Sequence, residues 1–234
     1  MDTSPGTDGP DDLTPVAQDY LKAVWSAQEW GEVRVTTGML AERLGVGPST
    51  VSETVRRLTA QGLLGHEPYS GVWLTDVGRR HALAMVRRHR LIETWLVREL
   101  GYGWDEVHDE AEVLEHAVSD RLVERIDARL GHPTRDPHGD PIPTADGRVE
   151  RPDAVPLEEL PEGASGVVAR ISDADPEALR YLSGLGLELD VEVTVEQRRD
   201  YAGTISLTWR GADGPVAVDL GHLAASRIRV VTTA

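Results

Sequence analysis

Two histidines and five carboxylates occur among the fourteen residues of the segment VHDEAEVLEHAVSD, residues 107–120. On a helix at about 100° per residue, the side chains of His108, Glu112, Glu115 and His116 fall within an arc of roughly 100°. The adjacent arc is apolar, so these polar groups are expected at the edge of a buried face. Close carboxylates there repel one another unless a cation neutralises them, and imidazole adds a borderline ligand. The spacing favours a metal site over the alternative, a solvated acidic surface with incidental histidines.

A second histidine–carboxylate pair, His89 and Glu93, stands at i and i+4 of the preceding helical segment and could converge on the first group. The chain has no cysteine, which excludes thiolate ligands, disulfides and a cysteine nucleophile. Nitrogen and oxygen donors suit Mn(II) or Fe(II), although raw affinity favours Zn(II) or Cu(II). Hydrolysis by Glu112 and Glu115 is the competing chemistry, and no HExxH, Gly-rich phosphate loop or obvious GxSxG motif supports it.

Charge is distributed unevenly along the chain. The whole chain has a net charge of −16, but residues 33–91 carry nine arginines against four acids, about +5, which leaves about −21 for the rest. Binding of nucleic-acid phosphates needs a basic footprint. The asymmetry indicates one basic module on an acidic body, with scattered surface arginines as the alternative.

The basic segment has the element order of a winged helix-turn-helix. An amphipathic helix is expected after Thr14 as N-cap and Pro15, and a second helix ends at Gly45. Pro48 begins a third helix, and two short strands follow around a turn at 68–71. The third helix would enter the DNA major groove, its polar residues at base edges and its arginines at phosphates. The candidate DNA-binding residues are Thr37, Pro48, Ser49, Thr50, Ser52, Glu53, Arg56 and Arg57.

Two long helices are expected next, at 76–101 and from about 104 to 130, with apolar stripes that favour a helical dimer interface. Beyond a Pro-, Gly- and Asp-rich linker, five short β-rich runs and one helix predict a small barrel. The fold class is multidomain α+β: a winged helix-turn-helix, an all-α dimerisation domain and an SH3-like β-barrel. The expected bounds are 1–12 for a disordered tail, 13–75 for the DNA-binding domain, 76–144 for the dimerisation and metal-binding domain, 145–160 for the linker and 161–234 for the SH3-like domain.

The runs DYLKAVW, AERLGVGPSTVSETVRRL, RRHRLIETWL and HDEAEVLEHAVSD, with PHGDPIP at 137–143, closely resemble the diphtheria toxin repressor family of metal-dependent transcriptional regulators. The match covers nearly the whole chain after about residue 13. The resemblance implies a homodimeric repressor that binds a palindromic double-stranded DNA operator and takes no small organic substrate. With no long apolar run and an acidic start to the chain, we expect a cytoplasmic protein without a membrane partner.

The resemblance also implies two sets of metal ligands. The primary set is Asp19, Glu112, Glu115 and His116, and the ancillary set is His89, Glu93 and His108 with an oxygen ligand from the SH3-like module. Asp175 is the candidate for that oxygen, although a helix N-cap explains it equally well. Asp19 and Glu112 stand where iron-type members carry Met and Cys, and hard oxygen in place of soft sulfur favours Mn(II) over Fe(II).

Two positions depart from the family pattern. Lys22 replaces a glutamate that small manganese-type members use to hold a second ion, so a close metal pair of that kind is not expected. Glu53 replaces a glutamine of iron-type members; it can accept from cytosine N4 but repels phosphate, so the operator sequence does not carry over.

The resulting prediction is a Mn(II)-activated repressor of manganese uptake genes. Three alternatives remain open: an Fe(II)-responsive regulator of the same family, a small-molecule-responsive winged-helix repressor, and a metallohydrolase. The SH3-like module is expected to have a packing or metal-accessory role, with recognition of Pro-rich segments such as 133–156 as its alternative.

Overall fold

The structure is a computed structural model that describes residues 13–31, 33–67, 71–211 and 214–233. The chain forms two compact units, one comprising residues up to 89 with 143–148, and the other comprising 90–142 with the residues from 149 onward. The long helix α4 (Asp76–Leu100) contributes to both. The predicted tail at 1–12 and most of the predicted turn at 68–71 lie outside the described residues. No helix in the described ranges is long and apolar enough to cross a membrane.

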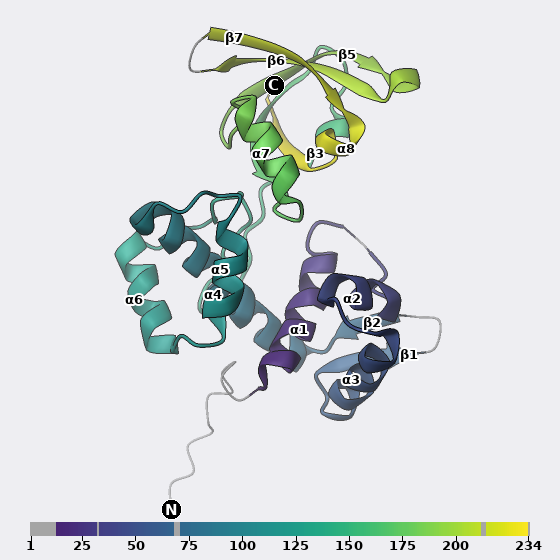
Figure 1. Ribbon diagram of the computed structural model, residues 1–234, viewed down its shortest axis with the longest axis vertical. Helices are drawn as coiled ribbons and strands as arrows, with labels where there is room; N and C mark the ends of the chain where they lie inside the picture. Colours follow the sequence, from purple (N-terminus) through teal and green to yellow (C-terminus); the bar gives the residue numbers. More distant parts are fainter. Residues whose placement is uncertain (1–12, 32, 68–70, 212–213, 234) are drawn as a thin grey trace, which may run out of the picture. The chain divides into compact units, whose positions relative to one another are not determined.

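The first unit consists of three helices and a β-hairpin, followed by the start of α4 (Figure 1). The elements before α4 are α1 (Pro15–Gln28), α2 (Thr37–Leu44), α3 (Pro48–Ala60), β1 (Leu64–Glu67) and β2 (Gly71–Leu74). The two strands pair antiparallel, and a β-bridge from Val35 to Val72 attaches the segment before α2 to the hairpin. This is the predicted order of a winged helix-turn-helix.

The helix ends of this unit lie at the capping residues expected from the sequence. Thr14 accepts a hydrogen bond from the Ala17 backbone N–H at 3.3 Å, and Pro15 is the first residue of α1. Gly45 ends α2 with a φ of +64°, a conformation that costs glycine little. Pro48 then starts α3. The short turn between α2 and α3 therefore forms a helix-turn-helix, and the polar face of α3 stays exposed.

The second unit begins with the C-terminal half of α4, α5 (Val107–Glu115) and α6 (Asp120–Leu130). The prediction of one helix from about 104 to 130 is wrong, because the chain breaks after α5. Ser119 starts the new helix by accepting a hydrogen bond from the Leu122 backbone N–H at 3.3 Å. His116 consequently occupies the C-cap of α5 instead of a mid-helix position.

Much of the apolar stripe that was expected to form a dimer interface is used inside the chain. The buried residues that join α4, α5 and α6 are Leu91, Ile92, Leu96, Val107, Ala111, Val123, Ile126 and Ile142. Val113 on α5 remains 71% exposed and Leu122 on α6 remains 44% exposed. The apolar surface left for a partner is therefore narrower than the apolar stripe expected from the sequence.

The C-terminal part of the second unit is a six-stranded antiparallel sheet in the order β3-β8-β4-β5-β6-β7. Its strands are β3 (Val155–Pro156), β4 (Ser165–Ile171), β5 (Glu192–Arg199), β6 (Thr204–Gly211), β7 (Gly214–Gly221) and β8 (Ile228–Thr233). Its helical elements are α7 (Pro176–Gly184), α8 (His222–Ala225) and the short 3₁₀ turns η2 (Leu157–Glu159) and η3 (Asp200–Ala202). Register shifts in the pairing of β4 with β8 and of β5 with β6 indicate bulges, which bend strands. The sheet curves around one core (Figure 1). The arrangement agrees with the predicted SH3-like domain.

Residues 155–160, predicted as the end of the linker, are part of this sheet domain. Val155 of β3 pairs with Val230 of β8, and Leu157 and Leu160 are buried in the domain's hydrophobic core. The Pro-, Gly- and Asp-rich stretch that leads into this segment concealed a two-residue strand and two core positions.

The loop at 136–140 packs closely against β4 through Gly139. Gly139 has a φ of +90°, and a Cβ at this position would collide with the backbone carbonyl of Ala169. Across the same contact, the Ile171 backbone N–H donates a hydrogen bond to the His138 carbonyl oxygen at 2.9 Å. A glycine at this position therefore lets the helical part of the unit and its sheet approach each other.

Substitution of Gly139 by alanine should lower the free energy of unfolding by about 3–5 kcal/mol, because it combines a strained φ with a backbone collision. Gly131→Ala is the matched control, since Gly131 also has a positive φ (+75°) but a Cβ there meets nothing within 4 Å. The control should cost only about 1–2 kcal/mol. Urea unfolding followed by circular dichroism measures both variants, and equal losses would contradict the proposed close packing.

Candidate metal centre

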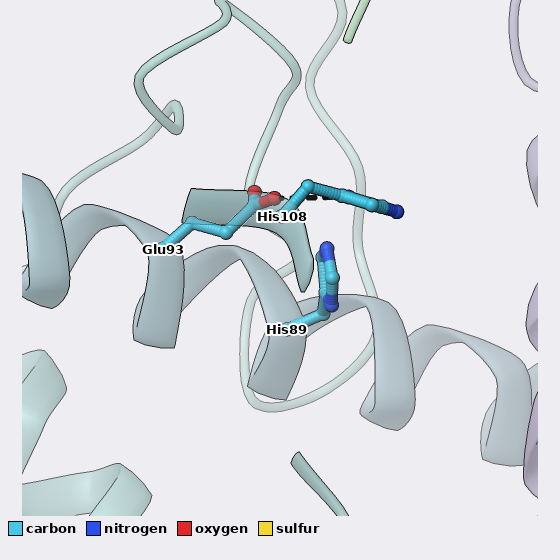
Figure 2. A group of neighbouring side chains, drawn as sticks. All are labelled: His89, Glu93 and His108. Atoms are coloured by element: carbon cyan, nitrogen blue, oxygen red, sulfur yellow. Dashed lines mark hydrogen bonds and ion pairs between the residues drawn. The ribbon is translucent and has the colours of Figure 1, made fainter. Parts of the chain in front are cut away.

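Three predicted ligands, His89, Glu93 and His108, come together where α5 lies against α4 (Figure 2). Glu93 Oε1 lies 3.3 Å from His108 Nδ1, and His89 stands one turn before Glu93 on α4. One ligand atom from each residue lies within 4.8 Å of the others. His89 and Glu93 are buried, whereas the His108 side chain is 42% exposed. Two imidazoles and a carboxylate at this spacing match the donor set of a divalent first-row metal ion.

The sheet domain adds a carboxylate to this group from the loop after β4. Asp173 Oδ2 lies 3.4 Å from His108 Nδ1. Asp175, the candidate from the sequence, instead caps α7 by accepting hydrogen bonds from the backbone N–H groups of Glu177 (3.0 Å) and Ala178 (3.2 Å). Sequence reasoning missed Asp173 because two acids in one loop share the same composition signal, and only the fold distinguishes the cap from the residue facing His108.

The C-terminal end of α5 carries the other predicted ligands of this unit. Glu115 is fully buried, and its Oε1 lies 3.6 Å from His116 Nε2. Glu112 is half-buried, with its Oε1 3.7 Å from His108 Nε2, so it approaches the histidine one turn before it. The remaining predicted ligand, Asp19, lies on α1 of the first unit.

A buried charged loop at 136–140, beside Glu93, was not identified as a site from the sequence. Asp136 Oδ1 accepts hydrogen bonds from the backbone N–H groups of His138 at 2.8 Å and Asp140 at 2.9 Å. All three side chains are buried. The segment PHGDPIP contributed only to the family resemblance, because the positions that a loop brings together have no periodic spacing.

Two arginines lie among these acids. Arg170 Nε donates to Asp140 Oδ1 at 2.6 Å, and Arg90 Nε lies 3.5 Å from Asp136 Oδ2. Arg90 also donates through Nη1 to the Pro141 carbonyl at 2.7 Å. The arginines thus fix the loop to α4 and to β4, and they leave Glu93 facing the histidines.

The electrostatics of the loop reflect an excess of negative charge. Burial, with the charges of Asp140 and Glu93, raises the pKa of Asp136 to about 8 against the opposing effect of His138 and Arg90. Burial alone would lower the pKa of His138, but the carboxylates of Asp136, Glu93 and Asp173 raise it overall above its ordinary value. Both raised pKa values mean that these groups hold their protons more tightly in the folded protein, so added positive charge stabilises this part of the molecule.

The candidate DNA-binding residues of α3 lie on the surface of the first unit. The exposed ones are Pro48, Ser49, Thr50, Ser52, Glu53, Arg56 and Arg57, and Thr37 at the start of α2 is half-buried. A depression of about 450 Å³ is lined by Thr37, Ser52 and Arg56 together with His66 of β1. His66 was not predicted, since the short strand that carries it has no DNA-binding pattern of its own. The arrangement presents hydroxyls, an imidazole and cations on one exposed face.

Comparison with known protein families matches three models along the chain. They are "Iron dependent repressor, N-terminal DNA binding domain" at 12–72, "Iron dependent repressor, metal binding and dimerisation domain" at 75–144, and "FeoA domain" at 155–231.

Similar curated proteins include the iron-dependent repressor IdeR of Mycobacterium leprae, 34% identical over 94% of this chain and 98% of that protein. The diphtheria toxin repressor of Corynebacterium efficiens is 33% identical over 90% of this chain and 94% of that protein. Among solved structures, a manganese-dependent transcriptional repressor in complex with manganese is 61% identical, covers 93% of this chain and 100% of its own, and superposes with a TM-score of 0.89. The structure of ScaR with bound Cd²⁺ is 34% identical, covers 93% of this chain and 99% of its own, and superposes with a TM-score of 0.80.

The raised pKa of Asp136 predicts a pH-dependent stability of the metal-free protein. The unfolded carboxyl ionises near its ordinary value of 3.8, whereas the folded one keeps its proton until about pH 8, so the folded state loses stability as the pH rises between these values. In chelator, the urea midpoint of the wild type should therefore fall relative to that of Asp136→Asn between about pH 5 and pH 8. The amide retains the oxygen that accepts from His138 and Asp140. A difference between the two proteins that stays constant across this range would contradict the assignment.

Proposed function

The chain belongs to the iron-dependent repressor family, and we propose that it is a Mn(II)-activated transcriptional repressor that binds a palindromic DNA operator as a homodimer. The observation that carries the proposal is the group of nitrogen and oxygen donors around Glu93, in a chain that also presents an exposed polar and basic face on α3. Uptake genes for manganese are the proposed targets, and the cytoplasm is the proposed location. No catalytic role is proposed for the acidic groups, since the family consists of repressors.

The metal is proposed to be Mn(II) because the donors are imidazole and carboxylate. No cysteine is present in the chain, and hard oxygen ligands favour Mn(II) over metal ions that prefer sulfur. The similar structure that contains manganese supports the same choice. Fe(II) is the alternative within the family, since it accepts the same kinds of ligand.

We assign the proposed ligands to two sites. The primary site consists of Asp19, Glu112, Glu115 and His116, as the family resemblance implies. The ancillary site consists of His89, Glu93 and His108, with Asp173 as the oxygen ligand from the sheet domain. Asp173 replaces Asp175 in this assignment because Asp173 faces His108, whereas both backbone contacts of Asp175 belong to the cap of α7.

The proposed switch uses the location of these residues in different units. Asp19 belongs to the DNA-binding unit, whereas Glu115 and His116 belong to the unit that contains the dimerisation domain. A metal ion bound by residues of both units would restrain their motion, and in a dimer it would set the separation of the two α3 helices to the half-site spacing of the operator. The metal ion can shift the equilibrium between unrestrained and restrained protein only to the extent that it binds the restrained state more tightly.

Dimer formation is proposed to use the apolar surface that α5 and α6 leave exposed. Val113 and Leu122 are the large apolar side chains that stay exposed on these helices, and exposed apolar surface is a common feature of interfaces. On DNA, Arg56 and Arg57 are proposed to contact phosphates, while Ser49 and its polar neighbours on α3 face base edges.

Recovery of genomic fragments bound by the purified protein tests the proposed function. Fragments are selected in Mn(II), in anaerobic Fe(II) and in chelator, and Glu115→Ala serves as the variant without a functional primary site. Enrichment of one palindromic sequence in Mn(II), lost in the variant, is expected and would also identify the regulated genes. Equal enrichment in chelator would contradict metal activation, and stronger enrichment in Fe(II) would favour the iron alternative.

Asp19→Ala should weaken operator binding in Mn(II) by about tenfold or more, the size typical of coupling between sites, while Mn(II) binding at the ancillary ligands is retained. The variant loses the ligand from the DNA-binding unit and with it the restraint, although the ligands of the other unit remain. Fluorescence anisotropy measures operator affinity, and equilibrium dialysis measures bound Mn(II).

The control for this comparison is Asp109→Ala, which removes an exposed acid of α5 outside both ligand sets. It should bind operator as the wild type does. Loss of operator affinity and of total Mn(II) binding to the same extent in Asp19→Ala would contradict the restraint mechanism.

A further inference from the structure

His138 is fully buried beside Glu93, and its two ring nitrogens have different surroundings. Nε2 lies 2.7 Å from the Trp104 backbone carbonyl oxygen. Because a carbonyl only accepts hydrogen bonds, Nε2 carries the proton and donates it. The Trp104 ring stacks on the imidazole with an interplanar angle of 18°, which fixes the orientation of the ring.

The other nitrogen, Nδ1, points at acidic groups. It is buried and makes no hydrogen bond with any of the residues that the structure describes. Glu93 Oε2 lies 3.9 Å away, which is too long for a hydrogen bond. When the imidazole is neutral and its proton is on Nε2, the Nδ1 lone pair points at a carboxylate oxygen and the two repel each other, so a proton or a metal ion must lie between them.

A divalent cation between these two atoms removes the repulsion. Metal–nitrogen and metal–oxygen bonds of about 2.0–2.2 Å each fit the gap between Nδ1 and Glu93 Oε2. Metal-binding histidines characteristically donate their second ring N–H to a carbonyl or carboxylate, which fixes the tautomer. The bond from His138 Nε2 to Trp104 is of this type.

Asp136 supplies the third donor. One ligand atom each of Glu93, Asp136 and His138 lies within 4.8 Å of the others, and all three residues are buried. The two backbone hydrogen bonds to Asp136 Oδ1 hold its carboxylate in place. Its Oδ2, which also pairs with Arg90 Nε at 3.5 Å, is the oxygen that would bind the cation.

The two oxygens of Glu93 face different histidines. Oε1 lies 3.3 Å from His108 Nδ1, and Oε2 lies 3.9 Å from His138 Nδ1. A carboxylate placed in this way can bridge two metal ions, which in such sites lie about 3.5–4 Å apart.

We propose that Glu93, Asp136 and His138 bind a divalent cation in addition to those of the primary and ancillary sites, bridged by the Glu93 carboxylate to the cation held by His89, Glu93 and His108. The inference rests on the proposed function in taking Mn(II) as the cation and in sharing Glu93. It uses none of the residues around Lys22, so it differs from the metal pair that the family pattern made doubtful. Through the Asp136–Asp140 loop and Arg170, occupancy of this site also stabilises the attachment of the loop to β4.

Crystals of the wild-type protein grown with Mn(II), measured at the manganese absorption edge, test the proposal without a variant. Two anomalous peaks on opposite sides of the Glu93 carboxylate, about 3.5–4 Å apart, are expected. A peak beside His89 and His108 with none beside Asp136 and His138 would overturn the proposal. That result would leave the proposed function intact, whereas a chain that binds no Mn(II) at all would contradict both.

Equilibrium dialysis with Mn(II) gives the corresponding test in solution. His138→Gln should bind one Mn(II) fewer per chain than the wild type, and Asp136→Asn, which keeps the shape of the side chain, should show the same loss if the histidine variant fails to fold. The matched control is His132→Gln, because the His132 side chain is 74% exposed and pairs with Asp127 outside this cluster. Equal numbers of bound ions in the wild type and a folded variant would overturn the proposal.

Discussion

Buried negative charge around Glu93 is the constraint on which the second unit depends. Removing a carboxylate from water costs several kcal/mol unless cations or hydrogen-bond donors surround it. Here α4 brings Glu93 and Arg90, α5 brings His108, and the loop at 136–140 brings Asp136. Because protons, arginines or metal ions must balance these acids, metal binding and the packing of α4, α5 and the sheet domain are energetically linked.

The proposed DNA-binding face on α3 depends on helix ends and on the burial of apolar side chains. Caps and glycine turns fix the ends of α2 and α3, and the buried apolar face of α3 leaves its hydroxyls and arginines exposed. The helix α4 is shared by both units and carries His89 and Glu93. The chain thereby connects the proposed DNA-binding face to the proposed metal ligands through one continuous helix, while the proposed Asp19 ligand would add a second connection that depends on the metal.

Features that follow a helical repeat can be predicted from the sequence, whereas residues that loops bring together cannot. Helical spacing put His89 and Glu93 on one face of a helix, the family resemblance joined His108 to them, and the structure brings the three side chains together. Capping chemistry located the ends of the first helices. Spacing did not reveal the break in the helix after His116, where the Ser119 hydroxyl caps a new helix. It also had no means of choosing Asp173 over Asp175, or of finding the cluster at 136–140, since loops bring residues together without a repeat.

Operator affinity measured against buffered free Mn(II) tests the central claim most directly. A labelled operator fragment is titrated with the protein at a series of Mn(II) concentrations and in chelator, and anisotropy reports the bound fraction. The account predicts weak binding in chelator and an affinity that rises with free Mn(II) until the sites are saturated. The same affinity at every Mn(II) concentration would contradict it, because the acidic groups around Glu93 would then have no connection to DNA binding.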